Sequence, residues 1–84
     1  MRLRVIIVHS AEKALTRIPE REQKKVRRKL KEIALNPFIG KKLQGELAGN
    51  YAVYAWPYRI MYRIEQKILT VYIVKIGHRQ GVYK

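Results

Sequence analysis

The chain contains no cysteine and no long apolar run. The absence of cysteine excludes a disulfide framework and a zinc site built on thiolates, and no metal or other cofactor is expected. A membrane-spanning helix needs about 20 apolar residues, and the run from Val5 to Val8 is also too short for the core of a signal peptide. The sequence therefore predicts a soluble, cytoplasmic protein that does not insert into a membrane.

Acidic residues are scarce as well. Six Asp and Glu residues stand against 19 Lys and Arg residues, which gives a formal net charge of +13 on 84 residues. So much charge of one sign on a small chain repels itself and favours an anionic partner. Nucleic acid, anionic lipid and an acidic protein are the candidate partners. The length indicates a single domain, residues 1–84.

The first half of the chain has the apolar spacing of one strand and two helices. Residues 3–8 are mostly β-branched and apolar, which predicts a buried strand. Helical spacing follows in Ala11–Ile18 and in Glu20–Leu35, with Pro19 between them as a helix breaker. Ser10 stands where the first helix needs an N-cap. The many cations of the second helix predict a solvated face that lies outside the functional site. Its predicted apolar stripe consists of Val26, Leu30, Ile33 and Ala34.

The second half predicts a loop and three strands. Residues 38–50 carry three glycines without periodicity, which indicates a loop. Strands are predicted over residues 51–56, 58–64 and 68–76, and their short connections require an antiparallel meander. The expected fold class is α+β, with the order β-α-α-β-β-β. Two helices would pack on one face of a mainly antiparallel, four-stranded sheet.

Alternation along residues 58–64 predicts which side chains remain on the open face of the sheet. The helices need an apolar face to cover, so Ile60 and Ile64 are expected to point inward, and Arg59 and Arg63 outward. A guanidinium matches two phosphate oxygens and stays charged. An open face with two arginines therefore suits a phosphate ligand.

Aromatic residues lie among these cations, a combination that suits phosphates and bases. Tyr54 and Trp56 are expected to share the face of Arg59, where they would stack on bases, fill a sheet groove or meet a protein partner. The remaining strand tyrosines are predicted to be sheet or core residues: Tyr51, Tyr62 and Tyr72.

Proton transfer near neutral pH favours histidine, whose ordinary pKa is about 6.5, over tyrosine at about 10. His78 is therefore a better candidate acid or base than Tyr83. His9, beside the predicted cap, is interpreted as structural.

Three motifs in this order resemble the RelE-like toxins of the RelE/ParE superfamily, which belong to type II toxin–antitoxin pairs. The motifs are Lys42-Leu43-x-Gly45, Tyr58-Arg59-Ile60-x-Tyr62, and Ile76-Gly77-His78-Arg79 with the closing Val82-Tyr83. The resemblance implies a ribosome-dependent endoribonuclease that cuts mRNA in the A site and so inhibits translation. The ribose 2′-hydroxyl attacks the phosphorus and leaves a cyclic phosphate and a 5′-hydroxyl.

The resemblance also implies roles for single residues. Arg59 would stabilise the charged phosphorane, Arg79 would be a second phosphate ligand, and Tyr83 would stack on the base. The sequence departs from the family at Gln44, Ala52 and Tyr54, where basic residues are usual, which predicts a weaker nuclease. The expected RNA contacts come from Lys41, Lys42, Tyr54, Arg63 and Lys84.

The implied partners are an acidic antitoxin, in a hetero-oligomer, and the ribosome with its mRNA and rRNA. Two alternatives stay open at this point. One is a ParE-like inhibitor of DNA gyrase, and the other is a basic nucleic-acid-binding module without catalysis. The presence of both Arg59 and Arg79 favours the nuclease.

Overall fold

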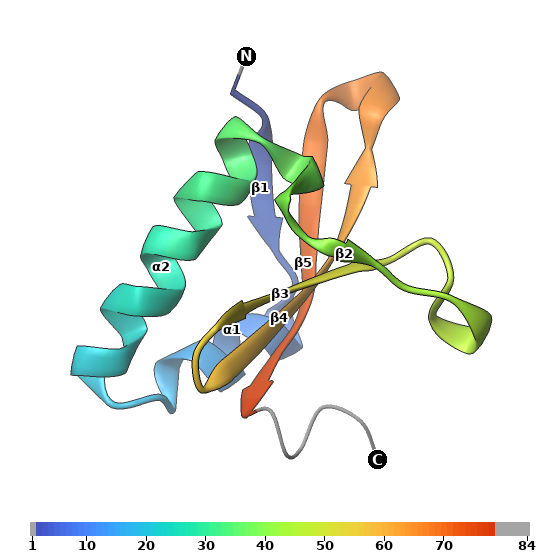
Figure 1. Cartoon of the computed structure of the whole chain (residues 1–84). Coiled ribbons are helices and arrows are strands. Elements are labelled where there is room, and N and C mark those ends of the chain that lie inside the picture. The colour runs from blue at the N-terminus through green and yellow to red at the C-terminus, as the bar shows by residue number, and fades with distance from the viewer. Residues whose placement is uncertain (1, 79–84) are drawn as a thin grey trace.

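Two helices cover one face of a twisted sheet in the computed structural model, which describes residues 2–78 (Figure 1). The fold is α+β, as predicted. Three short 3-10 helices, at residues 37–39, 45–47 and 66–68, lie in the connections. None of the helices in this part of the chain is long and apolar enough to span a membrane. The main elements are β1 (Arg4–Ile7), α1 (His9–Thr16), α2 (Glu20–Leu35), β2 (Lys41–Lys42), β3 (Tyr51–Ala55), β4 (Tyr58–Glu65) and β5 (Thr70–His78).

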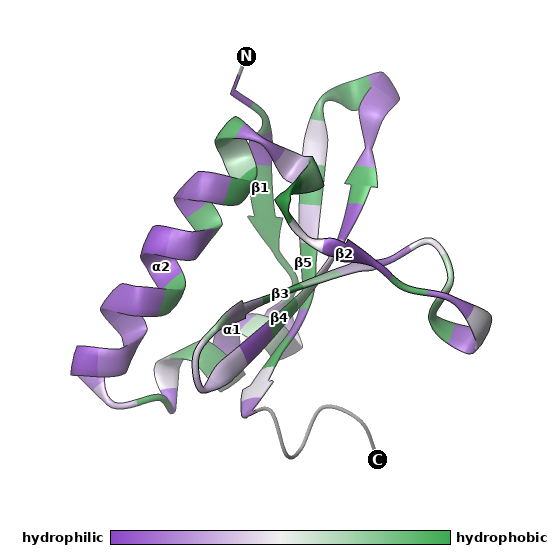
Figure 2. Cartoon of the chain, viewed as in Figure 1, coloured by the Kyte–Doolittle hydropathy of each residue, from purple (hydrophilic) through white to green (hydrophobic). Residues whose placement is uncertain are grey.

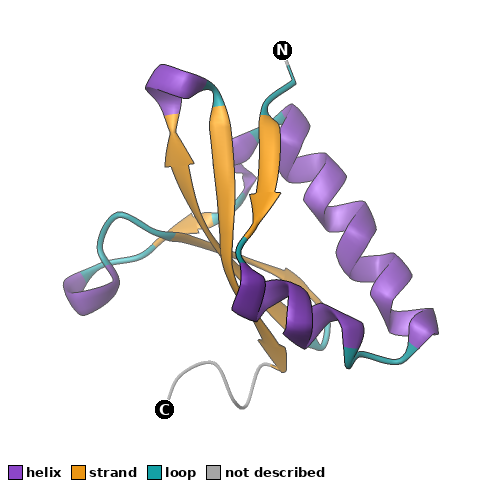
Figure 3. Cartoon of the chain, turned by 180° about the vertical axis from the view of Figure 1, so that it is seen from behind, coloured by secondary structure: helices purple, strands orange, loops and turns teal. Residues whose placement is uncertain are grey.

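The sheet has five strands in the order β1-β5-β4-β3-β2. β1 and β5 pair in parallel, and the other neighbours are antiparallel. Seen from behind, α1 lies against β5 while α2 runs alongside the sheet (Figure 3). The fifth strand corrects the expected four, because Lys41 and Lys42 pair with Ala52 and Tyr51 inside the segment predicted as a loop. A two-residue pairing leaves no periodicity in the sequence.

α2 follows its apolar stripe closely, whereas α1 ends at Thr16, before Ile18 of the predicted stripe. α2 has the predicted bounds, and its stripe of Val26, Leu30, Ile33 and Ala34 is buried. Figure 2 shows the hydrophobic side of α2 turned toward the sheet and its hydrophilic side turned away. The stripe packs on a core that includes Ile60, Tyr62, Val71 and Ile73.

The predicted N-cap of α1 is wrong. The helix begins at His9, its N-cap position is Val8, and Ser10 lies inside the first turn. The backbone N–H of Val8 donates to the carbonyl of Ile73 in β5 at 3.0 Å, and the carbonyl of Val8 accepts from Glu12 at 2.9 Å. The sheet therefore holds Val8 in extended conformation, and the helix starts directly after it.

Tyr62 connects the centre of the sheet to the segment that leads into β2. Its side chain is fully buried, and its hydroxyl donates to the carbonyl of Pro37 at 2.6 Å and accepts from the N–H of Gly40 at 3.0 Å. Its ring stacks on Tyr51, with centroids 5.6 Å apart. Gly40 lies so close that a Cβ there would stand 2.5 Å from this hydroxyl oxygen and 2.9 Å from the carbonyl oxygen of Ala52. The entry into β2 thus depends on one buried hydroxyl and one glycine.

Replacing this glycine tests the close approach. Gly40→Ala is expected to lower the free energy of unfolding by about 1–3 kcal/mol, because the added methyl overpacks a closed site. In a Tyr62→Phe background the same substitution is expected to cost less, since the nearest atom has been removed. Urea unfolding of the four variants measures both costs, and equal costs in the two backgrounds would contradict this account.

The buried hydroxyl also predicts a loss of stability in alkali. Burial raises the pKa of Tyr62 above its ordinary 10.0, a shift that the hydrogen bond from Gly40 partly opposes. The folded state therefore holds this proton more tightly than the unfolded state. The resulting stability is fully present below pH 10.0 and is lost as pH rises through the raised pKa.

Urea unfolding from pH 8 to 11 checks this expectation. Wild type is expected to lose up to about 1.4 kcal/mol per pH unit more than Tyr62→Phe above pH 10. Lysine titration is common to both proteins, so the difference isolates the tyrosine. Parallel curves would show that Tyr62 ionises alike in both states.

Candidate functional site

Arg59 lies at the centre of the sheet face that the helices leave open. Its cross-strand neighbours are Tyr54 of β3 and Gly77 of β5. The guanidinium carbon stands 5.1 Å from the centroid of the Tyr54 ring, a cation–π contact. Gly77 has no side chain, so β5 adds no bulk beside Arg59 in this row. The residue is half-buried, and the ring helps to orient its permanent charge at an open surface.

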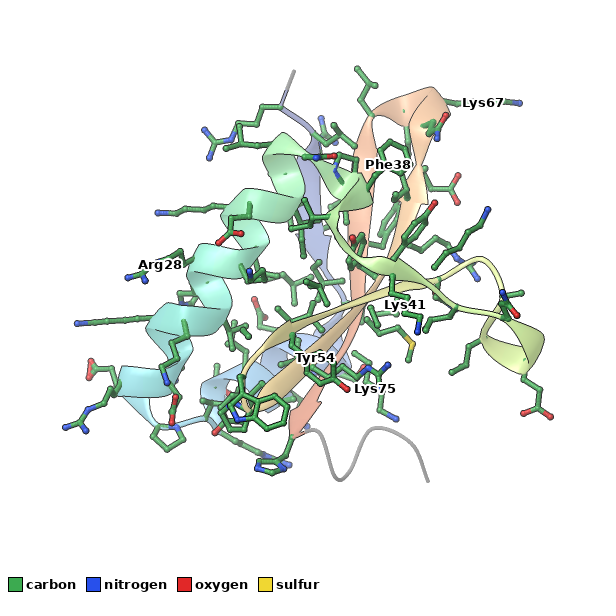
Figure 4. All side chains as sticks on the ribbon, viewed as in Figure 1. Arg28, Phe38, Lys41, Tyr54, Lys67 and Lys75 are labelled. Atoms are coloured by element: carbon green, nitrogen blue, oxygen red, sulfur yellow. The ribbon has the colours of Figure 1, made fainter. Side chains whose placement is uncertain are left out.

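The next row on this face places a lysine on each side of a buried floor. Lys41 of β2, Ala52 of β3, Met61 of β4 and Lys75 of β5 are neighbours in register. Ala52 and Met61 are buried, whereas both lysines are exposed. Figure 4 shows Lys41, Tyr54 and Lys75 in one region of the sheet, on three different strands. The row next to Arg59 thus carries one cation at each end.

Lys75 is a site residue that the sequence analysis missed. The register of β4 and β5 shifts between Met61, which pairs with Lys75, and Tyr62, which pairs with Ile73. Val74 is the extra residue, and an irregularity of this kind turns the following side chains to the other face. Strict alternation would place Lys75 on the buried side with Ile73. Ile73 and Ile76 are both in the core although they are three residues apart. This spacing of two apolar residues was the feature of the sequence that could have indicated the irregularity.

His78 lies on the other side of the sheet from Arg59, which corrects the prediction that the two act together. His78 pairs with Tyr58, and Arg59 pairs with Gly77. The rings of Tyr58 and His78 meet edge to face with centroids 5.9 Å apart, and Tyr58 packs against the core under the helices. Neighbouring residues of a strand point to opposite faces. His78 therefore belongs to the helix side.

The other predicted site residues also lie on different faces of the sheet. Arg63 shares the face of Arg59, further along β4, and is exposed. Lys42 pairs with Tyr51, a core-side residue, so it is turned away from Lys41 and does not join the site, contrary to the prediction. Three further predicted residues lie outside the described part of the chain: Arg79, Tyr83 and Lys84.

The open face keeps a positive charge. Both ion pairs within residues 2–78 lie on α2, Lys25 with Glu22 at 3.0 Å and Lys29 with Glu32 at 3.1 Å. In the same range, no three His, Cys, Asp or Glu side chains gather as metal ligands. An open sheet face that carries cations and an exposed aromatic ring has the chemistry to bind a phosphodiester and an adjacent base.

A fold of this kind also occurs in RelE toxins of known structure. The sequence pattern of the family described as ParE toxin of type II toxin–antitoxin system, parDE, matches residues 5–83. The chain belongs to this family and is a toxin of the type II toxin–antitoxin class. The resemblance proposed from the three sequence motifs is confirmed.

Individual relatives agree with this assignment. Toxin RelG of Mycobacterium tuberculosis is 39% identical over 46 residues, which cover 55% of this chain and 53% of RelG, so the match spans about half of that relative. The toxin–antitoxin complex RelBE2 of the same organism has a TM-score of 0.88 at 30% identity, over 94% of this chain and 100% of that chain.

Two more distant structures share the fold. The archaeal RelE–RelB complex from Pyrococcus horikoshii OT3 has a TM-score of 0.82 at 23% identity, over 98% of this chain and 100% of that chain. A double mutant of E. coli toxin RelE in the free state has a TM-score of 0.82 at 20% identity, over 98% of this chain and 88% of that chain.

Proposed function

We propose that this toxin is a ribosome-dependent endoribonuclease that cuts mRNA in the A site and so inhibits translation. The observation that carries the proposal is the placement of Arg59. Its guanidinium stands on an open face, against the ring of Tyr54 and between strands that bring Lys41 and Lys75. A guanidinium donates two parallel hydrogen bonds to phosphate oxygens and is charged at all physiological pH values.

The proposed reaction is an intramolecular transesterification at phosphorus. The ribose 2′-oxygen loses its proton and forms a bond to the neighbouring phosphorus, and the bond from phosphorus to the 5′-oxygen breaks. The 5′-oxygen takes up a proton, which leaves a 2′,3′-cyclic phosphate and a 5′-hydroxyl. Charge builds on the phosphorane oxygens in between, and Arg59 stabilises that charge. One donor of this kind typically contributes about 3–4 kcal/mol to the transition state.

The neighbouring side chains would hold the substrate strand. Lys41 and Lys75 lie at the two ends of the row next to Arg59 and suit the adjacent phosphates as point charges. The Tyr54 ring is exposed and suits a base. In the family pattern Arg79 and Tyr83 add a second phosphate ligand and a base contact. The placement of His78 on the helix side does not support it as the acid or base.

The cognate partner we infer is an acidic antitoxin that masks this basic surface in a hetero-oligomer. Several of the structures that resemble this chain are toxin–antitoxin complexes. A net charge of +13 favours a partner of opposite sign. Such a partner would cover the open face and keep RNA from Arg59.

The family description also names ParE, so inhibition of DNA gyrase is the second candidate function. A basic binding module without catalysis is the third. Neither alternative requires a guanidinium held beside an aromatic ring in the middle of an open sheet. Cleavage of mRNA by the wild-type chain separates the first function from both.

Primer extension on an mRNA in a purified translation system tests the role of Arg59. Arg59→Ala is expected to lower the cleavage rate by about 100- to 1,000-fold, because one donor to the charged phosphorane is lost. Arg27→Ala, an equal loss of charge on the exposed side of α2, serves as the control and is expected to cleave at the wild-type rate. Absence of cuts by wild type at concentrations that arrest growth, together with supercoiling defects, would contradict the proposal and favour gyrase.

A pair of lysine variants tests the placement of Lys75. Lys75→Gln and Lys42→Gln each remove one exposed charge, but only Lys75 shares the face of Arg59. Cleavage at sub-saturating toxin over a range of KCl concentrations is the measurement. Lys75→Gln is expected to reduce the slope of log rate against log salt by about 0.7, the value for one lost contact to a single strand. Lys42→Gln is expected to keep the wild-type slope, and equal slopes for the two variants would remove Lys75 from the site.

A further inference from the structure

A groove runs between α2 and the end of β3, beside the candidate site but on the other side of the sheet edge. β2 pairs only with Tyr51 and Ala52 among the described residues, so the last residues of β3 form a free edge of the sheet. α2 lies next to this edge. The side chains that line the groove are Lys25, Arg28, Lys29 and Glu32 of α2, with Tyr54, Ala55 and Trp56 at the end of β3.

Two large aromatic rings stand exposed at this edge. The centroids of Tyr54 and Trp56 are 5.6 Å apart with an interplanar angle of 51°. Tyr54 is 44% exposed and Trp56 is 59% exposed, whereas Ala55 between them is buried. Burial of Ala55 anchors the backbone, so both rings are presented to solvent from a fixed position. Exposed aromatic rings on a rigid edge are a surface on which planar groups stack.

The opposite wall of the groove is cationic. The lining contains three cations, Lys25, Arg28 and Lys29, and one acid, Glu32. Lys29 pairs with Glu32, and Lys25 pairs with Glu22. Surface ion pairs of this kind contribute little energy and are readily exchanged for another anion. Arg28 makes no ion pair within residues 2–78 and also lines the neighbouring groove on α2 with Lys24, Arg27 and Lys31. The groove thus combines rings on one wall with phosphate-binding groups on the other.

Tyr54 connects this groove to the candidate site. One side of its ring meets the guanidinium of Arg59, and the residue also lines the groove with Trp56. A nucleic-acid strand that crosses the open face at Arg59 can therefore continue around the free edge of β3. Stacked rings along a basic groove are how proteins hold single-stranded nucleic acid.

We propose that this groove is a stacking subsite for single-stranded RNA. A base lies on the rings of Tyr54 and Trp56, and the adjoining phosphate contacts Lys25 and Arg28 of α2. The choice of RNA as the ligand rests on the proposed function. The subsite positions the strand next to Arg59 and takes no part in the transfer at phosphorus.

The chain offers a direct probe of this subsite, because Trp56 is its single tryptophan. The ligand is a 2′-O-methyl RNA pentamer, which cannot be cleaved and so reports binding alone. Stacking of a base on Trp56 is expected to quench its fluorescence. Inorganic polyphosphate of the same charge carries no base and is expected to bind without that quenching. Equal quenching by the two ligands would overturn the proposal in favour of a general anion site.

Variants locate the contacts. Tyr54→Ala is expected to weaken binding of the pentamer by about 5- to 140-fold, the range for one lost stacking contact, and Tyr54→Phe is expected to retain it. Lys25→Gln is expected to lower the slope of log affinity against log salt by about 0.7. Lys24→Gln is the matched control, since the adjacent Lys24 lines the neighbouring groove on α2 and not the groove beside β3. Equal effects of the two lysine variants would contradict the proposed contact.

Arg59→Ala separates this inference from the proposed nuclease. At a saturating concentration of the pentamer the variant is expected to keep the quenching of Trp56, because Arg59 does not line the groove, although loss of its contact with the Tyr54 ring is expected to weaken binding. Wild-type cleavage of mRNA without quenching would overturn the subsite alone. Quenching without any cleavage of mRNA would contradict the nuclease and leave the subsite standing.

Discussion

The hydroxyl of Tyr62 is the contact on which the geometry of the open face depends. It is buried at the centre of the sheet and satisfies two backbone groups, the carbonyl of Pro37 and the N–H of Gly40. Phe38 and Ile39 of the segment after α2 remain exposed, and these two hydrogen bonds direct the segment onto β3. A buried hydroxyl that makes both hydrogen bonds favours one arrangement of the backbone around it. If either hydrogen bond is lost, a buried polar group is left without a protein partner or water. The position of Lys41, one residue further on, follows from this contact.

The shortness of β2 has a second consequence. Because β2 covers only the beginning of β3, the sheet has a paired half that carries the row of Lys41 and Lys75, and a free edge at Tyr54. Free edges are usually protected by charge or by a covering element. Here α2 lies beside the edge and contributes cations. Tyr54 therefore belongs to two surfaces at once, the open face of Arg59 and the groove of Trp56.

The distribution of charge explains how a chain with so few acids can fold and still bind anions. Both ion pairs within residues 2–78 lie along α2, at Glu22 and Glu32, so acids moderate the repulsion where cations are densest. On the open face, Arg59 instead borders an aromatic ring and a glycine. The ring of Tyr54 extends this surface toward α2, since Tyr54 contacts Arg59 and also lines the groove.

The sequence alone determined the bounds of α2, the inward isoleucines of β4, the outward Arg59 and the toxin family, because these features follow from local periodicity and short motifs. It did not show β2, the bulge that turns Lys75 outward or the side on which His78 lies. Those features are set by register, which depends on the hydrogen bonds that each strand finds in its neighbours. Trp56 could be read as an exposed ring beside Tyr54. Its placement against the cations of α2 was decided only by the packing of this helix beside the edge of β3. The two elements are about 20 residues apart in the chain, and periodicity carries no information over that distance.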